Sequence, residues 1–103
     1  MNIFSHLRRP EPTLDPRMAP AMNAFLRGGR PGELKVVDAT TVYYRHRKTS
    51  ARFFLRDGHI FGWLLEGRRL ASLQWRGDYW QSQSRMVNLD DRLYYEERIE
   101  GRY

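Results

Sequence analysis

Short runs of alternating apolar and polar residues, separated by glycine-containing turns, fill the middle of the chain. The turn signals Asp57-Gly58, Glu66-Gly67 and Gly77-Asp78 recur at nine- and ten-residue spacing. Turns of this kind between β-branched and aromatic runs are typical of β-hairpins. The pattern therefore predicts an antiparallel meander, with strands in ARFFLR, HIFGWLLE, RRLASLQWR and YWQSQ.

A helical periodicity precedes the meander. Apolar residues spaced i, i+3, i+4, i+7 and i+8 form one stripe: Met18, Ala21, Met22, Phe25 and Leu26. Asp15 before Pro16 is a suitable cap and first position, and Gly28-Gly29 is a suitable stop. Because a proline crowds the carbonyl four residues before it, Pro20 predicts that the regular helix begins at Ala19-Pro20.

Two further segments leave alternatives open. Residues 33–46 are β-branched and aromatic, which predicts one bent strand or two short strands around Asp38-Ala39-Thr40. Residues 86–99 predict either another hairpin around Asp90-Asp91 or a closing helix capped by Asn88 or Asp90.

These elements predict a single α+β domain over residues 15–103, with a short N-terminal helix packed on an antiparallel meander sheet of five or six strands. A hydrophobic content of 41% in 103 residues is sufficient for one modest core. Residues 1–14 are expected to form a flexible basic arm. All five prolines lie in the first third of the chain, so the remainder suits continuous strand pairing.

Two-residue turns fix the register and so separate the side chains into two faces. They predict the cross-strand pairs Leu55–Ile60, Phe53–Gly62, Ala51–Leu64, Ile60–Leu73, Gly62–Ala71 and Trp75–Trp80. One face is then apolar, with Arg69 near its edge, and is expected to carry the helix: Ala51, Phe53, Leu55, Ile60, Leu64, Ala71, Leu73, Trp75 and Trp80.

The opposite face mixes arginines with aromatic residues and contains no carboxylate. It comprises Arg52, Phe54, Arg56, His59, Phe61, Trp63, Arg68, Leu70, Ser72, Gln74, Arg76, Tyr79 and Gln81. Bases can stack on such rings while arginines neutralise phosphates. The net charge of +6 also favours an anionic partner.

We therefore expect a non-enzymatic protein that binds single-stranded or structured nucleic acid. Cations at Arg45, Arg47, Lys48, Arg52 and Arg56 would contact phosphates, with the connection over residues 45–50 acting as a basic loop. Rings at Phe54, Phe61 and Trp63 would stack on bases, and His59 and Arg68 complete the predicted site.

The same face has other possible uses. Its apolar residues could be covered by the C-terminal segment, which brings Leu93, Tyr94, Tyr95 and Ile99, or could form a homodimer interface. It could also belong to a protein-interaction module, of the kind that small mobile-element proteins use to bind or inhibit a host factor, and an acidic protein is another possible partner. Residues 86–103 carry five acids against three arginines, so this segment could pair with the basic face.

The composition excludes several kinds of chemistry. The chain has no cysteine, and His6, His46 and His59 lack metal-ligand spacing, so neither a metal nor a cofactor is predicted. A metal-independent endoribonuclease is a further alternative, using Glu66 with Arg52 or Arg68 and with His59 or His46. Glu66, however, falls at the far end of its strand from His59.

The location is expected to be cytoplasmic. The first twelve residues lack the apolar run of a secretory signal. No stretch approaches the roughly 20 apolar residues that span a bilayer, so no membrane association is predicted.

Overall fold

The computed structural model describes residues 12–101. A short 3-10 turn, η2 (Pro16–Met18), leads into helix α1 (Ala19–Arg27). The strands and the closing helix follow in chain order: β1 (Leu34–Asp38), β2 (Thr41–His46), β3 (Thr49–Arg56), β4 (His59–Glu66), β5 (Arg69–Trp75), β6 (Trp80–Met86) and α2 (Leu89–Glu100).

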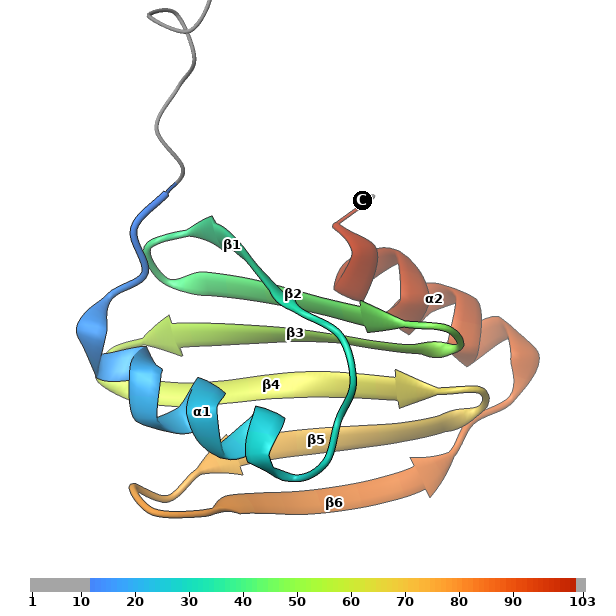
Figure 1. Cartoon of the computed structure of the whole chain (residues 1–103). Helices are drawn as coiled ribbons and strands as arrows, with labels where there is room; N and C mark the ends of the chain where they lie inside the picture. Colours follow the sequence, from blue (N-terminus) through green and yellow to red (C-terminus); the bar gives the residue numbers. More distant parts are fainter. Residues whose placement is uncertain (1–11, 102–103) are drawn as a thin grey trace, which may run out of the picture.

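The six strands form one antiparallel sheet in the order β1-β2-β3-β4-β5-β6, so each strand pairs only with its neighbours in the chain. Helix α1 lies across one face of this sheet and α2 lies on the opposite face (Figure 1). The predicted α+β meander with a short N-terminal helix is confirmed. The closing helix adds a third layer.

Helix α1 begins where Pro20 predicts. The Asp15 carboxylate accepts a hydrogen bond from the Arg17 backbone N–H at 2.9 Å and caps the 3-10 turn that precedes the helix. This turn absorbs Pro16, and the α-helical ladder starts at Ala19. The helix stops at Gly28, whose successor Gly29 has φ +82°.

The main core lies between α1 and the sheet, on the face predicted to be apolar. Its buried members come from η2, from α1 and from β2 to β5: Met18, Ala21, Met22, Phe25, Val42, Tyr44, Ala51, Phe53, Leu55, Ile60, Leu64, Ala71 and Leu73. The ring of Phe53 lies 4.7 Å from that of Phe25 and 5.3 Å from that of Trp80. The Trp80 indole also donates to the carbonyl oxygen of Ala21 at 2.8 Å, which ties α1 to β6.

Two of the three predicted hairpin registers are confirmed, and the middle one is wrong by two residues. Phe53 pairs with Gly62, and Trp75 pairs with Trp80, as the turns predict. Between β4 and β5, however, Gly62 pairs with Leu73, and Leu64 pairs with Ala71. The loop is Gly67-Arg68 instead of Glu66-Gly67, because Gly67, with φ +59°, takes the first loop position. A shift of two residues preserves which side chains share a face.

Residues 33–46 form two short strands, the second of the two predicted alternatives. The pairing of these strands shifts between Val36 and Asp38. The predicted basic loop over residues 45–50 is instead a tight turn at Arg47-Lys48, since His46 already pairs with Thr49. Most of the predicted basic arm lies outside the described residues, but Leu14 near its end packs against the core.

The C-terminal segment forms the helix of the two alternatives. The Asn88 side chain accepts a hydrogen bond from the Asp91 backbone N–H at 2.8 Å, and the helix ends at Gly101 with φ +77°. Ile99 is buried against the sheet in a second cluster with Leu65, Leu70 and Val87. Within residues 12–101, neither helix is long and apolar enough to span a membrane.

Candidate nucleic-acid interface

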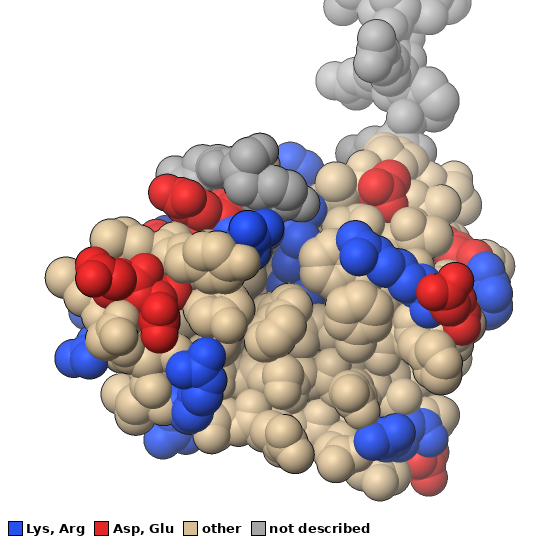
Figure 2. Space-filling view, turned by 180° about the vertical axis from the view of Figure 1, so that it is seen from behind, with Lys and Arg blue, Asp and Glu red and all other residues tan. Residues whose placement is uncertain are grey.

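Helix α2 covers only part of the face behind α1, and a groove of about 420 Å³ lies between this helix and strands β3 and β4. Viewed from behind, the face is mostly uncharged, with Lys and Arg side chains in the hollow beside α2 and around the margins (Figure 2). The groove is lined by Arg52, Phe54, Arg56, Phe61, Trp63, Tyr94, Tyr95, Arg98 and Ile99.

Two pairs of aromatic rings form its floor. Phe54 and Phe61 are direct partners across the β3–β4 ladder, and their rings stack at 5.4 Å with an interplanar angle of 30°. Two residues further along β4, Trp63 faces the same side because side chains alternate along a strand. Its ring lies 5.5 Å from that of Tyr95 on α2, at 35°. Phe54, Phe61 and Trp63 are each only partly buried, so their rings are accessible from the groove.

Helix α2 supplies the wall. Tyr94 and Arg98 are four residues apart and therefore neighbours on the helix surface. The Arg98 guanidinium carbon lies 4.3 Å from the centre of the Tyr94 ring. Tyr95 and Ile99 have the same spacing on the side of the helix that faces the sheet, and Ile99 is buried there.

Among residues 12–101, three arginines and no carboxylate line the groove. Arg56 is exposed at the end of β3, with its guanidinium carbon 5.0 Å from the centre of the Phe54 ring. Arg52 is held more firmly, since its Nε donates to the carbonyl oxygen of Ile99 at 2.6 Å. The lining therefore places positive charge beside partly exposed aromatic rings, a combination that many proteins use to bind single-stranded nucleic acids.

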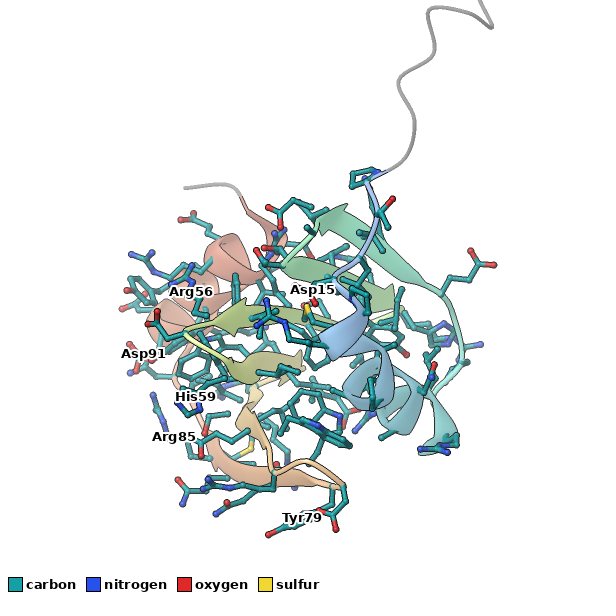
Figure 3. The ribbon with its side chains drawn as sticks, turned by 90° about the vertical axis from the view of Figure 1, so that its left-hand side faces the viewer. Asp15, Arg56, His59, Tyr79, Arg85 and Asp91 are labelled. Atoms are coloured by element: carbon teal, nitrogen blue, oxygen red, sulfur yellow. The ribbon has the colours of Figure 1, made fainter. Side chains whose placement is uncertain are left out.

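Five residues of the predicted site line the groove: Arg52, Phe54, Arg56, Phe61 and Trp63. His59 pairs with Arg56 across the β3–β4 turn, just beyond the end of the groove. Figure 3 shows both side chains on the side of the sheet that carries α2. The structure therefore places all three predicted stacking residues together with two of the five predicted phosphate-binding residues.

The other four predicted residues lie elsewhere. Arg47 and Lys48 form the β2–β3 turn, and Arg68 lies in the β4–β5 turn, all at the opposite end of the sheet from Arg56. The Nε of Arg68 donates to the carbonyl oxygen of Val87 at 2.8 Å, so this side chain anchors the segment that leads into α2.

Arg45 meets the acidic C-terminal helix. It forms an ion pair of 2.7 Å with Glu100, whose other carboxylate oxygen accepts a hydrogen bond of 2.5 Å from the Tyr43 hydroxyl. Burial and the Glu100 carboxylate raise the pKa of Tyr43 above its usual value. Part of the basic face is thus neutralised by α2, and part of its apolar surface, Leu70 included, is buried under the helix.

Glu66 and His59, one of the pairs nominated for ribonuclease chemistry, are not brought together, whereas the alternative His46 is aligned with Glu66 on the other side of β3, since both residues pair with Thr49. Glu66 and His59 are the two ends of the eight-residue strand β4 and, because side chains alternate along a strand, they lie on opposite faces of the sheet. The Glu66 carboxylate accepts a hydrogen bond from the Thr49 hydroxyl at 3.2 Å. General acid–base catalysis needs both groups within reach of one substrate, and this pair does not meet that condition.

Sequence reasoning did not assign Tyr94, Tyr95 and Arg98 to the site. The signal that could have identified them is the i, i+4 spacing of Tyr94 with Arg98 and of Tyr95 with Ile99. This spacing places side chains together only in a helix, and the sequence of this segment is also compatible with a hairpin.

Comparison with protein-family models, with curated proteins and with solved structures finds no match to this chain. The function must therefore be inferred from the groove itself.

Proposed function

We propose that this chain is a small, non-enzymatic nucleic-acid-binding protein that holds single-stranded nucleic acid in the groove between α2 and strands β3 and β4. The observation that carries the proposal is the lining of the groove, where the described residues place stacked rings beside three arginines and include no carboxylate. Aromatic platforms bind bases, and arginines bind phosphates.

The partly buried rings define where bases would stack. A base can stack on the exposed part of the Phe54–Phe61 pair, and a second can extend the Trp63–Tyr95 pair. Both positions need an unpaired base, because the faces of bases in a duplex are already covered by their neighbours. The proposal is therefore specific for single strands, loops or unpaired ends.

The arginines define where the backbone would run. Arg56 lies at one end of the groove and Arg98 on its helical wall, with the rings between them. A strand that follows this line would place its phosphates at the arginines and its bases on the rings. With three arginines engaged, we expect log K to fall with log salt at a slope of about −2.

The test is a fluorescence-anisotropy titration of labelled single-stranded and double-stranded oligonucleotides at low and at moderate salt. The proposal expects binding to single strands, weaker binding to duplexes, and a salt slope near the value above. Equal affinity for both would indicate an unspecific attraction by the net charge of +6. An absence of binding at low salt would overturn the proposal.

A protein partner is the second candidate, because the outer side of α2 exposes large apolar side chains. Leu89 is 60% exposed, Leu93 48% and Tyr94 50%. An interface built on these residues would persist at high salt, whereas phosphate contacts weaken there. Pull-down with the purified protein at low and high salt separates the two candidates.

A further inference from the structure

The two edges of the sheet differ in how they are protected from pairing with another strand. At one edge, the pairing of β1 is irregular between Val36 and Asp38, and the strand carries Lys35 and Asp38. Bulges and charges of this kind prevent edge-to-edge association. At the other edge, β6 pairs with β5 in an unbroken register and contains no proline and only one charge, Arg85. No described element lies along the outer side of β6 (Figure 1).

The direction of the backbone groups of β6 follows from its hairpin. The Arg76 N–H donates to the carbonyl oxygen of Tyr79, and the Val87 N–H donates to that of Arg68. Antiparallel ladders alternate between hydrogen-bonded and non-bonded pairs. The odd-numbered residues of β6 therefore turn their N–H and C=O groups toward β5. The even-numbered residues, which are Trp80, Ser82, Ser84 and Met86, present theirs at the open edge.

The sequence of this edge is complementary to itself. If two copies of Trp80–Met86 pair antiparallel about Gln83, every outward-facing residue meets another: Trp80 faces the partner's Met86, and Ser82 faces the partner's Ser84. On the α2 side, Arg85 faces the partner's Gln81, so no like charges are opposed. Aromatic–sulfur and hydroxyl pairs of this kind stabilise cross-strand contacts.

We propose that the chain forms a two-fold symmetric dimer through β6, which joins two sheets into one. The occupant of the open edge is thus a second copy of this chain. This inference goes beyond the proposed function and does not depend on it.

The dimer would also bring two binding surfaces together. In an antiparallel pair of identical strands, each residue and its symmetry mate point to the same side of the sheet. Both α2 helices and both grooves would therefore lie on one face. A smaller hollow of about 210 Å³ leads from Trp63 of the groove to Gln83 and Arg85 at the edge. Two such hollows would meet at the two-fold axis.

Single-cysteine variants test the register, since the chain has no cysteine of its own. At the dimer axis, Gln83 faces its own symmetry mate in a non-hydrogen-bonded pair, where Cα atoms are about 4.5 Å apart. This separation lies within the range of about 4.4–6.8 Å that a disulfide spans. Q83C is therefore expected to form a disulfide-linked dimer under mild oxidation. Q81C is the matched control, because its symmetry mate is about 13 Å away along the strand.

The oligomeric state is measured by sedimentation equilibrium between micromolar and millimolar protein. The wild type is expected to dimerise, and more strongly as salt rises, because each copy carries +6. S84P removes an outward N–H without taking a hydrogen bond from β5, so it is expected to abolish the dimer while circular dichroism stays unchanged. A wild type that is monomeric throughout, a dimer that S84P leaves intact, or equal cross-linking of Q83C and Q81C would each overturn the proposal.

Discussion

Arg52 donates from its Nε to the carbonyl oxygen of Ile99 over 2.6 Å, and this bond ties the middle of β3 to the last turn of α2. The last carbonyls of a helix have no partner within it, and a cation there also interacts favourably with the helix dipole. One side chain of the floor of the groove thus fixes its wall.

Replacing Arg52 by alanine is expected to lower the free energy of unfolding by about 1–3 kcal/mol, because the buried end of α2 loses its charged donor. Amide hydrogen exchange in α2 should accelerate while that of β3–β5 changes little. The matched control is Arg56→Ala, since Arg56 is exposed and its guanidinium lies over the Phe54 ring on the same strand. Equal stability of the two variants would contradict the anchoring role.

Replacing Arg56 by glutamine tests the phosphate contact. Oligonucleotide affinity should fall, and the salt slope should become shallower by about 0.7, the contribution of one phosphate on a single strand. Arg27→Gln is the control, because Arg27 is an exposed arginine on α1, on the other face of the sheet. If both variants lose the same affinity, net charge rather than the groove is responsible.

Replacing Phe61 by leucine tests stacking separately from charge. The leucine keeps most of the apolar contact with Phe54 but removes the ring, so binding should weaken by about 1–3 kcal/mol for each base that stacks there. The salt slope should not change, which distinguishes this variant from Arg56→Gln. Tyr79→Leu serves as the control, since Tyr79 lies at the β5–β6 turn away from the groove (Figure 3) and is 57% exposed. Unchanged affinity in a folded Phe61→Leu protein would remove the ring from the mechanism.

Gly62 is expected to tolerate no side chain. A Cβ at this position would lie 2.6 Å from Cδ1 of Phe53 and 2.8 Å from the backbone oxygen of Arg52, inside the main core. Overpacking of this kind costs about 1–3 kcal/mol, so Gly62→Ala should shift the urea midpoint downward by the corresponding amount. Gly58→Ala is the control for backbone strain alone. Gly58 has φ +76°, and nothing lies within 4 Å of a Cβ at this position. A Gly62→Ala protein as stable as the wild type would show that Phe53 can move aside.

Asp15 is expected to contribute to stability in acid. Hydrogen bonds from the Arg17 side chain and backbone lower the pKa of Asp15 from 3.8 to about 2. Because the folded pKa is below the unfolded one, the contribution is complete above pH 3.8 and is lost as the pH falls toward 2. Asp15→Asn should therefore show a smaller drop in Tm between pH 5 and pH 2 than the wild type. The effect should shrink in high salt, since the pair is exposed to solvent.

The sequence predicts the strand register correctly where only one pair of residues can form the hairpin loop. Asp57 and Gly58 both adopt positive φ, at 52° and 76°, and an Asp-Gly pair satisfies this turn in only one alignment. Gly67 allows two alignments, as its neighbours on both sides can occupy the other loop position. The faces of the sheet were still predicted correctly, because both alignments keep the same alternation.

The wall of the groove could not be predicted because the apolar residues of α2 do not mark its buried side. Leu89 and Leu93 are exposed, whereas the buried contacts come from Ile99 and the partly buried Tyr95. Arg92 and Arg52 further anchor this segment through backbone carbonyls, of Gly67 and Ile99 respectively. Contacts between side chains and distant carbonyls leave no periodic trace in a sequence.

The nearest-neighbour order of the strands has a consequence for how the protein folds. Each hairpin closes over a short loop, so the sheet can assemble by local steps, and local contacts favour rapid folding. The groove requires a contact across 47 residues between Arg52 and Ile99, whose closure costs more chain entropy. We therefore expect the sheet to form first and the binding site last. In stopped-flow refolding, the fluorescence of Trp63 beside Tyr95 should lag behind the far-ultraviolet signal of the strands.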